Sequence, residues 1–208
     1  LSCHQDGEVL VANGAHKGKC LGAVLSKDVS SYIGGHYAMN SSTLPILIKL
    51  IDTEDDLSIQ VHPSNETANS LLGEEGKAEL WYILDCDKDS YIYLGLKDTI
   101  PIDALRKHLQ EGTILPLLNK VNIHKGDFIY VPGGTIHALG KNILLAEIQQ
   151  NSNTTFRLYD YLRMDSTGKH RKLHLEEGLR ILDNQAFSPS NVMQFSDIIQ
   201  PSIGYLGD

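Results

Sequence analysis

Short apolar runs separated by polar turns recur along the whole chain. Runs of four to eight apolar, β-branched or aromatic residues bounded by turn residues are typical of β-strands. They predict strands at residues 46–51, 58–62, 77–84, 91–95, 121–123, 128–131, 136–139, 142–149 and 154–161. A further strand is expected at residues 8–11, which lie between an Asp-Gly and an Asn-Gly turn signal.

Helical patterns are fewer than strand patterns. The clearest is residues 101–109, with Ile102, Leu105 and Leu109 on one face and Gly112 as a stop signal. A second amphipathic helix is expected at residues 173–182, and short helices at residues 21–28 and 66–72. Many short strands with helices placed as insertions indicate an all-β barrel or jelly roll, and not a doubly wound α/β sheet.

Composition and charge narrow the class of protein. The 208 residues allow one domain with an appendage, and no apolar stretch approaches the 18 residues of a membrane span. The net charge of −8 argues against a general nucleic-acid partner, and an anionic substrate would need a local cluster of Lys and Arg. Cys3, Cys20 and Cys86 are odd in number and widely spaced, as expected for reduced thiols of a cytoplasmic protein without a secretion leader.

Three strands carry side chains that can bind a metal ion. Side chains two residues apart share one face of a strand, so Gln60 points the same way as His62, and Lys77 the same way as Glu79. Glu79 lies in an apolar strand, where a carboxylate is costly unless it meets a cation. His137 follows a Gly-Gly turn, where the backbone can approach another strand closely.

These four groups form a donor set of one amide, two imidazoles and one carboxylate. Such a set suits one Zn²⁺ per chain, with Fe²⁺ or Mn²⁺ as alternatives. Only one donor carries a formal charge, so a bound ion remains a strong Lewis acid, which favours a catalytic over a structural role. Each residue alone is a weak signal, because a lone histidine on a strand is more often a surface or hydrogen-bonded residue.

Lys49 interrupts the apolar run at residues 46–51. A buried lysine is costly unless it meets a cavity, water or an anion. The alternative is an edge lysine whose ammonium group reaches solvent.

Several segments resemble one known family. Residues 126–137 (Gly-Asp-Phe-Ile-Tyr-Val-Pro-Gly-Gly-Thr-Ile-His) resemble the second cupin motif. Residues 45–49, 57–63, 76–82 and 149–161 are similar to type I mannose-6-phosphate isomerases (phosphomannose isomerases) of the short bacterial kind, and the likeness runs in order from about residue 1 to residue 182.

The resemblance implies a cupin-type jelly-roll barrel with small helical insertions and a metal-dependent aldose–ketose isomerase. Such an enzyme interconverts mannose 6-phosphate and fructose 6-phosphate through an enediol, so its partner is a small sugar phosphate, and we expect a monomer or weak homodimer. The residues that correspond to the family's zinc ligands are Gln60, His62, Glu79 and His137. Arg157 corresponds to the active-site arginine, and the positions that line the substrate pocket are Lys49, Ser58 and Lys77. Of these, Lys77 is also our candidate acid/base group.

The chain departs from the family at Asn153, where the family usually has Asp. It also departs at both ends, where members of the family are longer. We expect residues 1–165 to form the metal-binding cupin domain, which is the catalytic domain of the isomerase. We expect residues 166–208 to form a helical segment and the start of a linker to a second, C-terminal cupin-like domain that this sequence lacks.

Three alternatives remain open from the sequence. The first is a non-catalytic sugar-phosphate-binding module. The second is a metal-dependent cupin oxygenase, since two histidines and a carboxylate also suit ferrous iron. For Arg157, the alternative to a catalytic role is a salt bridge with Asp160.

Overall fold

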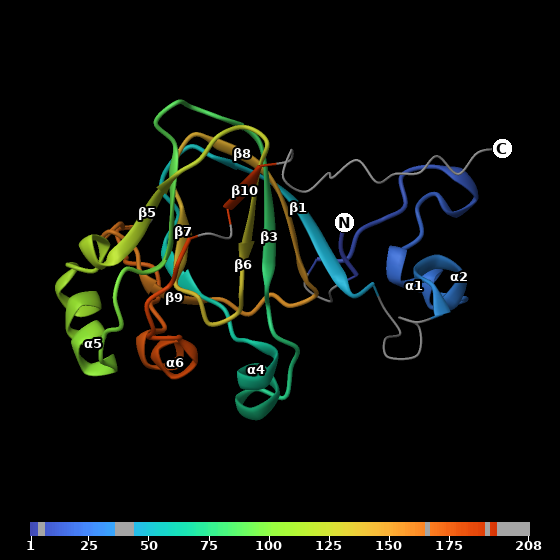
Figure 1. Cartoon of the computed structure of the whole chain (residues 1–208). Coiled ribbons are helices and arrows are strands. Elements are labelled where there is room, and N and C mark those ends of the chain that lie inside the picture. Colours follow the sequence, from blue (N-terminus) through green and yellow to red (C-terminus); the bar gives the residue numbers. More distant parts are fainter. Residues whose placement is uncertain (4–6, 36–43, 165–166, 190–191, 195–208) are drawn as a thin grey trace.

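Two antiparallel β-sheets form the centre of the molecule (Figure 1). The computed structural model describes residues 1–3, 7–35, 44–164, 167–189 and 192–194. The first sheet has the strand order β1-β8-β3-β6-β10 and contains β1 (Ile46–Thr53), β8 (Ile143–Gln150), β3 (Glu79–Cys86), β6 (Asp127–Val131) and β10 (Val192–Gln194). The second sheet has the order β5-β4-β7-β2-β9 and contains β5 (Leu118–Asn122), β4 (Tyr91–Leu96), β7 (His137–Leu139), β2 (Ile59–Val61) and β9 (Phe156–Tyr159).

The inner faces of the two sheets pack against each other. Alternate residues of β3, β6 and β8 point inward, and together with residues of β4 and β7 they form one apolar cluster. Its fully buried members include Trp81, Ile83, Leu94, Ile129 and Leu145. Burying side chains of this size contributes about 1.5–3 kcal/mol each, so this cluster holds the two sheets together.

A second apolar cluster covers the outer face of the second sheet. It joins β2, β4 and β9 to α5 (Ile102–Glu111) and α6 (Leu175–Ile181), which lie side by side in Figure 1. Leu105 and Leu109 are the buried residues of α5, and Gly112 ends this helix with a left-handed φ of 70°. The amphipathic pattern and its stop signal are therefore confirmed.

The remaining helices of the described residues are short and peripheral. They are η1 (Gly14–His16), α1 (Leu21–Leu25), α2 (Val29–Ile33), α4 (Asn65–Leu71) and η2 (Leu115–Leu117). Figure 1 shows α1 and α2 beyond β1, on the opposite side of the sheets from α5 and α6. The all-β prediction with small helical insertions is thus confirmed, and within the described residues no helix has the length and apolar character needed to cross a membrane.

One predicted strand does not form, and one strand was not predicted. Residues 8–11 form no strand, and Leu10 makes an isolated bridge with Cys20 instead, because the chain turns into η1 directly afterwards. Residues 192–194 have no recognisable pattern, yet they form the edge strand β10, which pairs with β6. Beyond the expected boundary at residue 165, α6 packs on β9 and contributes to the second cluster, while residues 195–208 lie outside the described part of the chain.

Candidate active site

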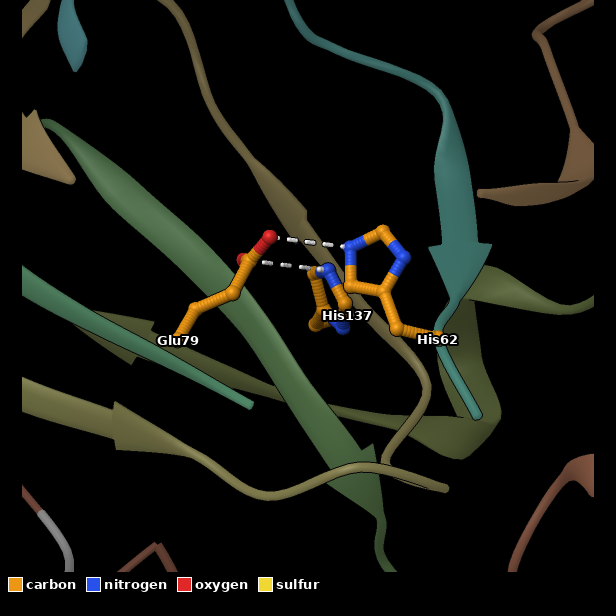
Figure 2. A group of neighbouring side chains, drawn as sticks. All are labelled: His62, Glu79 and His137. Atoms are coloured by element: carbon orange, nitrogen blue, oxygen red, sulfur yellow. Dashed lines mark ion pairs between the residues drawn. The ribbon is translucent and has the colours of Figure 1, made fainter. Parts of the chain in front are cut away.

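Three buried side chains converge between the two sheets, as Figure 2 shows. The ligand-capable atoms of His62, Glu79 and His137 all lie within 4.8 Å of one another. Their exposed fractions are 2%, 2% and 0%. Glu79 begins β3 of the first sheet, while His62 follows β2 and His137 begins β7 of the second. The sequence prediction that these three residues come together is therefore confirmed.

The turn before His137 brings the two histidines together. A Cβ atom on Gly133 would lie 2.6 Å from the Cα of Ser64 and 2.7 Å from the carbonyl oxygen of Pro63, so only glycine fits this approach. The next residue, Gly134, has a φ of 89° and donates its N–H to the carbonyl of His62 at 2.7 Å. The Gly-Gly pair thus packs the turn directly against the backbone that carries His62.

Backbone carbonyls determine the tautomers of both imidazoles. Nδ1 of His62 lies 3.0 Å from the carbonyl oxygen of Thr154, and Nδ1 of His137 lies 2.8 Å from that of Thr135. A carbonyl oxygen can only accept, so each Nδ1 carries the proton and each neutral ring keeps a lone pair on Nε2.

Both lone pairs point at Glu79. Nε2 of His62 lies 3.0 Å from one carboxylate oxygen, and Nε2 of His137 lies 3.8 Å from the other. Among the described residues, the buried Nε2 of His137 has no hydrogen-bond partner. Lone pairs that face a carboxylate are stabilised by a cation between them, so these three donors fit a divalent metal ion.

The pKa values support this donor set. Burial lowers the pKa of His62 from 6.5 to about 4, against the opposing effect of Glu79. Burial also lowers the pKa of His137. Burial alone would raise the pKa of Glu79, but His62, Lys77 and His137 outweigh it and lower that pKa. At neutral pH the group therefore consists of two neutral imidazoles and a carboxylate.

Lys77 lies directly beside this group. Its Nζ is 3.1 Å from a carboxylate oxygen of Glu79, 3.2 Å from Nε2 of His62 and 3.3 Å from Oγ1 of Thr155. The lysine is buried, and burial lowers its pKa although Glu79 opposes the shift. A cationic donor is thus held next to the proposed metal ligands.

A row of three residues crosses the second sheet at the same level. Gln60 of β2 is opposite His137 of β7 on one side and Arg157 of β9 on the other. Directly opposite residues of antiparallel strands share a face. Gln60 and Arg157 are therefore on the face that carries His137, which is where a fourth ligand and a positive charge were expected.

Arg157 does not pair with Asp160. Its Nε donates to Oγ of Ser58 at 3.3 Å, and its Nη1 donates to the carbonyl oxygen of Lys172 at 3.0 Å. Burial and the nearby charge of Arg171 lower the pKa of Arg157. The ion pairs of Asp160 are instead with Arg163 and Arg171. The guanidinium of Arg157 is therefore not neutralised by the carboxylate of Asp160.

Lys49 meets an anion inside the sheet. Its Nζ lies 2.8 Å from the carboxylate of Glu147, its direct neighbour on β8, and it also donates to the side chain of Gln149. The Lys49 side chain is 37% exposed, whereas Glu147 and Gln149 are buried. Glu147 was missed in the sequence, although a carboxylate in an apolar run is the same signal that singled out Glu79.

Comparisons with known proteins find the same family that the sequence motifs resemble. A family model described as the catalytic domain of phosphomannose isomerase type I matches residues 1–91. The chain is 43% identical over 184 residues to mannose-6-phosphate isomerase ManA of Bacillus subtilis (strain 168), a match covering 88% of this chain and 57% of that protein. Along most of its length the chain is similar to members of the type I phosphomannose isomerase family. A mannose-6-phosphate isomerase of Streptococcus mutans is 38% identical over 182 residues, covering 88% of this chain and 56% of that protein.

A solved structure of this family shares the fold. The crystal structure of the mannose 6-phosphate isomerase from Bacillus subtilis superposes with a TM-score of 0.79 and 38% sequence identity, covering 88% of this chain and 57% of that one. The chain thus spans somewhat more than half the length of the relatives it matches. Asn153, where we expected a departure from the family, is exposed, and its carbonyl accepts from Oγ1 of Thr155 at 3.5 Å.

Proposed function

We propose that this chain is the metal-dependent catalytic part of an aldose–ketose isomerase that interconverts mannose 6-phosphate and fructose 6-phosphate through an enediol. The observation that carries the proposal is the buried His62–Glu79–His137 group, in which two imidazole lone pairs face one carboxylate beside Lys77. The relatives named mannose-6-phosphate isomerase support the substrate class.

The proposed metal ligands are His62, Glu79, His137 and the amide of Gln60. Zinc suits this donor set, with another divalent metal as the alternative. When bound, the ion would polarise a substrate oxygen and so stabilise the negative charge that develops on it. The carbonyls of Thr154 and Thr135 orient the two imidazoles for this role.

Isomerisation between C1 and C2 requires a group that moves a proton. We assign this role to Nζ of Lys77, because it lies 3.1 Å from a carboxylate oxygen of Glu79 within the donor group, and burial lowers its pKa, which makes proton exchange easier than for an exposed lysine. Thr155 and Glu79 hold the amine in place.

Positive charge near the reacting carbons would stabilise the enediolate. Arg157 is suited to this, since its guanidinium remains protonated and Ser58 and Lys172 hold it. We propose Lys49 and Ser58 as substrate contacts.

A cytoplasmic location is also proposed, supported by the unpaired thiols of Cys3, Cys20 and Cys86.

The test is a coupled isomerase assay on the purified chain, before and after a chelator and after readdition of zinc. We expect the chelator to abolish turnover of mannose 6-phosphate and zinc to restore it. Turnover that persists without metal would contradict the mechanism. Tight binding of mannose 6-phosphate without turnover would favour the non-catalytic module, and iron-dependent oxygen uptake would favour the oxygenase.

A further inference from the structure

The short segment 171–174, which leads into α6, holds Arg157 at three points. Nη1 of Arg157 donates to the carbonyl of Lys172 at 3.0 Å. The backbone N–H of Arg157 donates to Nδ1 of His174 at 3.3 Å, and the backbone N–H of His174 donates to the carbonyl of Arg157 at 2.7 Å. The position of the guanidinium therefore depends on where this segment lies relative to β9.

An ion pair attaches the same segment to the end of β9. Nε of Arg171 donates to Oδ2 of Asp160 at 2.7 Å, and its Nη2 donates to Oδ1. Two parallel N–H···O bonds to one carboxylate fix distance and orientation together. Asp160 is buried and lies three residues beyond Arg157, so the pair ties the segment to the strand that carries Arg157.

We propose that Arg171 is a positioning residue of the isomerase: its two hydrogen bonds to Asp160 hold segment 171–174 against β9, and Lys172 and His174 of that segment direct the guanidinium of Arg157. The inference rests on the proposed function, in which Arg157 stabilises the enediolate. A misplacement of about 1 Å in such a group costs up to about 10²-fold in rate.

Removal of Arg171 should leave the fold intact. Asp160 also accepts a hydrogen bond from Nη2 of Arg163, so Arg171→Ala does not leave a buried carboxylate without a partner. What the substitution removes is the link between segment 171–174 and the end of β9.

Arg106 offers a matched control. Its Nε and Nη2 donate to the two carboxylate oxygens of Glu176 at 3.0 and 3.1 Å, which is the same two-point contact between α5 and the start of α6. Its side chain is 32% exposed, compared with 44% for Arg171. The acceptors of its side chain are Glu176 and Asp103, neither of which belongs to segment 171–174.

The experiment measures kcat, KM and zinc content for Arg171→Ala, Arg106→Ala, Arg157→Ala and the Arg171→Ala/Arg157→Ala double variant. For Arg171→Ala we expect kcat to fall by about 10–100-fold with zinc content unchanged. For Arg106→Ala we expect less than about twofold change, in the range of ordinary surface substitutions. In the double variant we expect no loss beyond that of Arg157→Ala, because Arg171 acts through Arg157.

A loss from Arg171→Ala that persists in full without Arg157, or an equal loss from Arg106→Ala, would overturn the proposal. A second measurement does not depend on activity. Hydrogen exchange of the backbone amides of Arg157 and His174 should be faster in Arg171→Ala than in the wild type or Arg106→Ala, and unchanged exchange would also overturn it. If the wild-type chain has no isomerase activity, the proposed function is wrong, and the exchange rates alone decide whether Arg171 holds Arg157.

Discussion

The two sheets contribute different functional groups to the site. The first sheet provides the buried carboxylates Glu79 and Glu147, while the second provides two neutral imidazoles and the row that contains Gln60 and Arg157. Neither sheet alone carries a complete donor set. The site therefore depends on the apolar cluster that packs the inner faces together.

The outer faces of the sheets differ as well. The second sheet is covered by α5 and α6, whereas the first exposes apolar residues such as Leu50, Tyr130 and Leu144. Stability and chemistry thus both depend most on the space between the sheets. Substitutions that affect one sheet or one face test this comparison.

The largest effect is expected from removing the charge that the first sheet contributes. Glu79→Gln keeps the shape of the side chain but leaves the two imidazoles and Lys77 without a carboxylate. We expect zinc to be lost and activity to fall by more than about 10²-fold, beyond the cost of losing a residue that only orients a ligand. Metal analysis and the coupled assay measure both. Glu147→Gln, a change in the buried carboxylate that pairs with Lys49, should keep its zinc, and equal zinc loss in both variants would contradict the assignment.

The second sheet is tested by Arg157→Ala. We expect kcat to fall by about 10²–10³-fold with zinc retained, as for loss of one preorganised electrostatic donor. Steady-state kinetics at saturating mannose 6-phosphate measure this effect. A rise in KM with kcat unchanged would make Arg157 a binding group and not a catalytic one.

Acid should destabilise the metal-free protein through the second sheet. Below pH 6.5 the unfolded chain protonates His62, but the folded chain does not until about pH 4, because burial lowers the pKa. The unfolded state then binds more protons, so the free energy of unfolding falls by about 3 kcal/mol as pH drops through this window. Above the window, the stabilising contribution of His62 is fully present. Glu79, whose pKa is also lowered, acts in the same direction at lower pH.

Urea unfolding of the chelated protein between pH 7.5 and about pH 4 checks this slope. His62→Gln should reduce the slope, because glutamine does not titrate, while His137, whose pKa burial also lowers, still contributes. An identical slope in this variant would show that other groups cause the acid sensitivity.

The smallest effect compares the two faces of one strand, β6. Ile129 is fully buried between the sheets, and Tyr130 points outward with 44% exposure. We expect Ile129→Val to cost about 1 kcal/mol in the free energy of unfolding and Tyr130→Thr no more than about 0.5 kcal/mol. A larger cost for Tyr130→Thr in urea unfolding would show that the outer face of the first sheet is covered in solution.

Much of the fold was predictable because it rests on local patterns. The apolar runs of β1 and β8 predict strands, and Gly112 marks the end of α5. β10 was not predictable, since its place depends on the hydrogen bonds that β6 offers.

Part of the site was predictable because some of its residues are unusual within their local sequence patterns. Glu79 in an apolar strand and His137 after two glycines are each unusual enough to notice, and the family resemblance joined them to Gln60 and His62. Glu147 was overlooked, although it lies within the strand expected at residues 142–149 and carries the same signal as Glu79.

The sequence by itself determined most of the strands and which of their side chains share a face, because the period of two along a strand is a local property. Only the tertiary structure decided that Asp160 pairs with Arg171 and leaves Arg157 to Ser58 and Lys172. Several arginines lie within reach of one carboxylate along the chain, and the choice among them depends on how β9, segment 171–174 and α6 pack. That packing is a balance of non-local contacts, which no short stretch of sequence encodes.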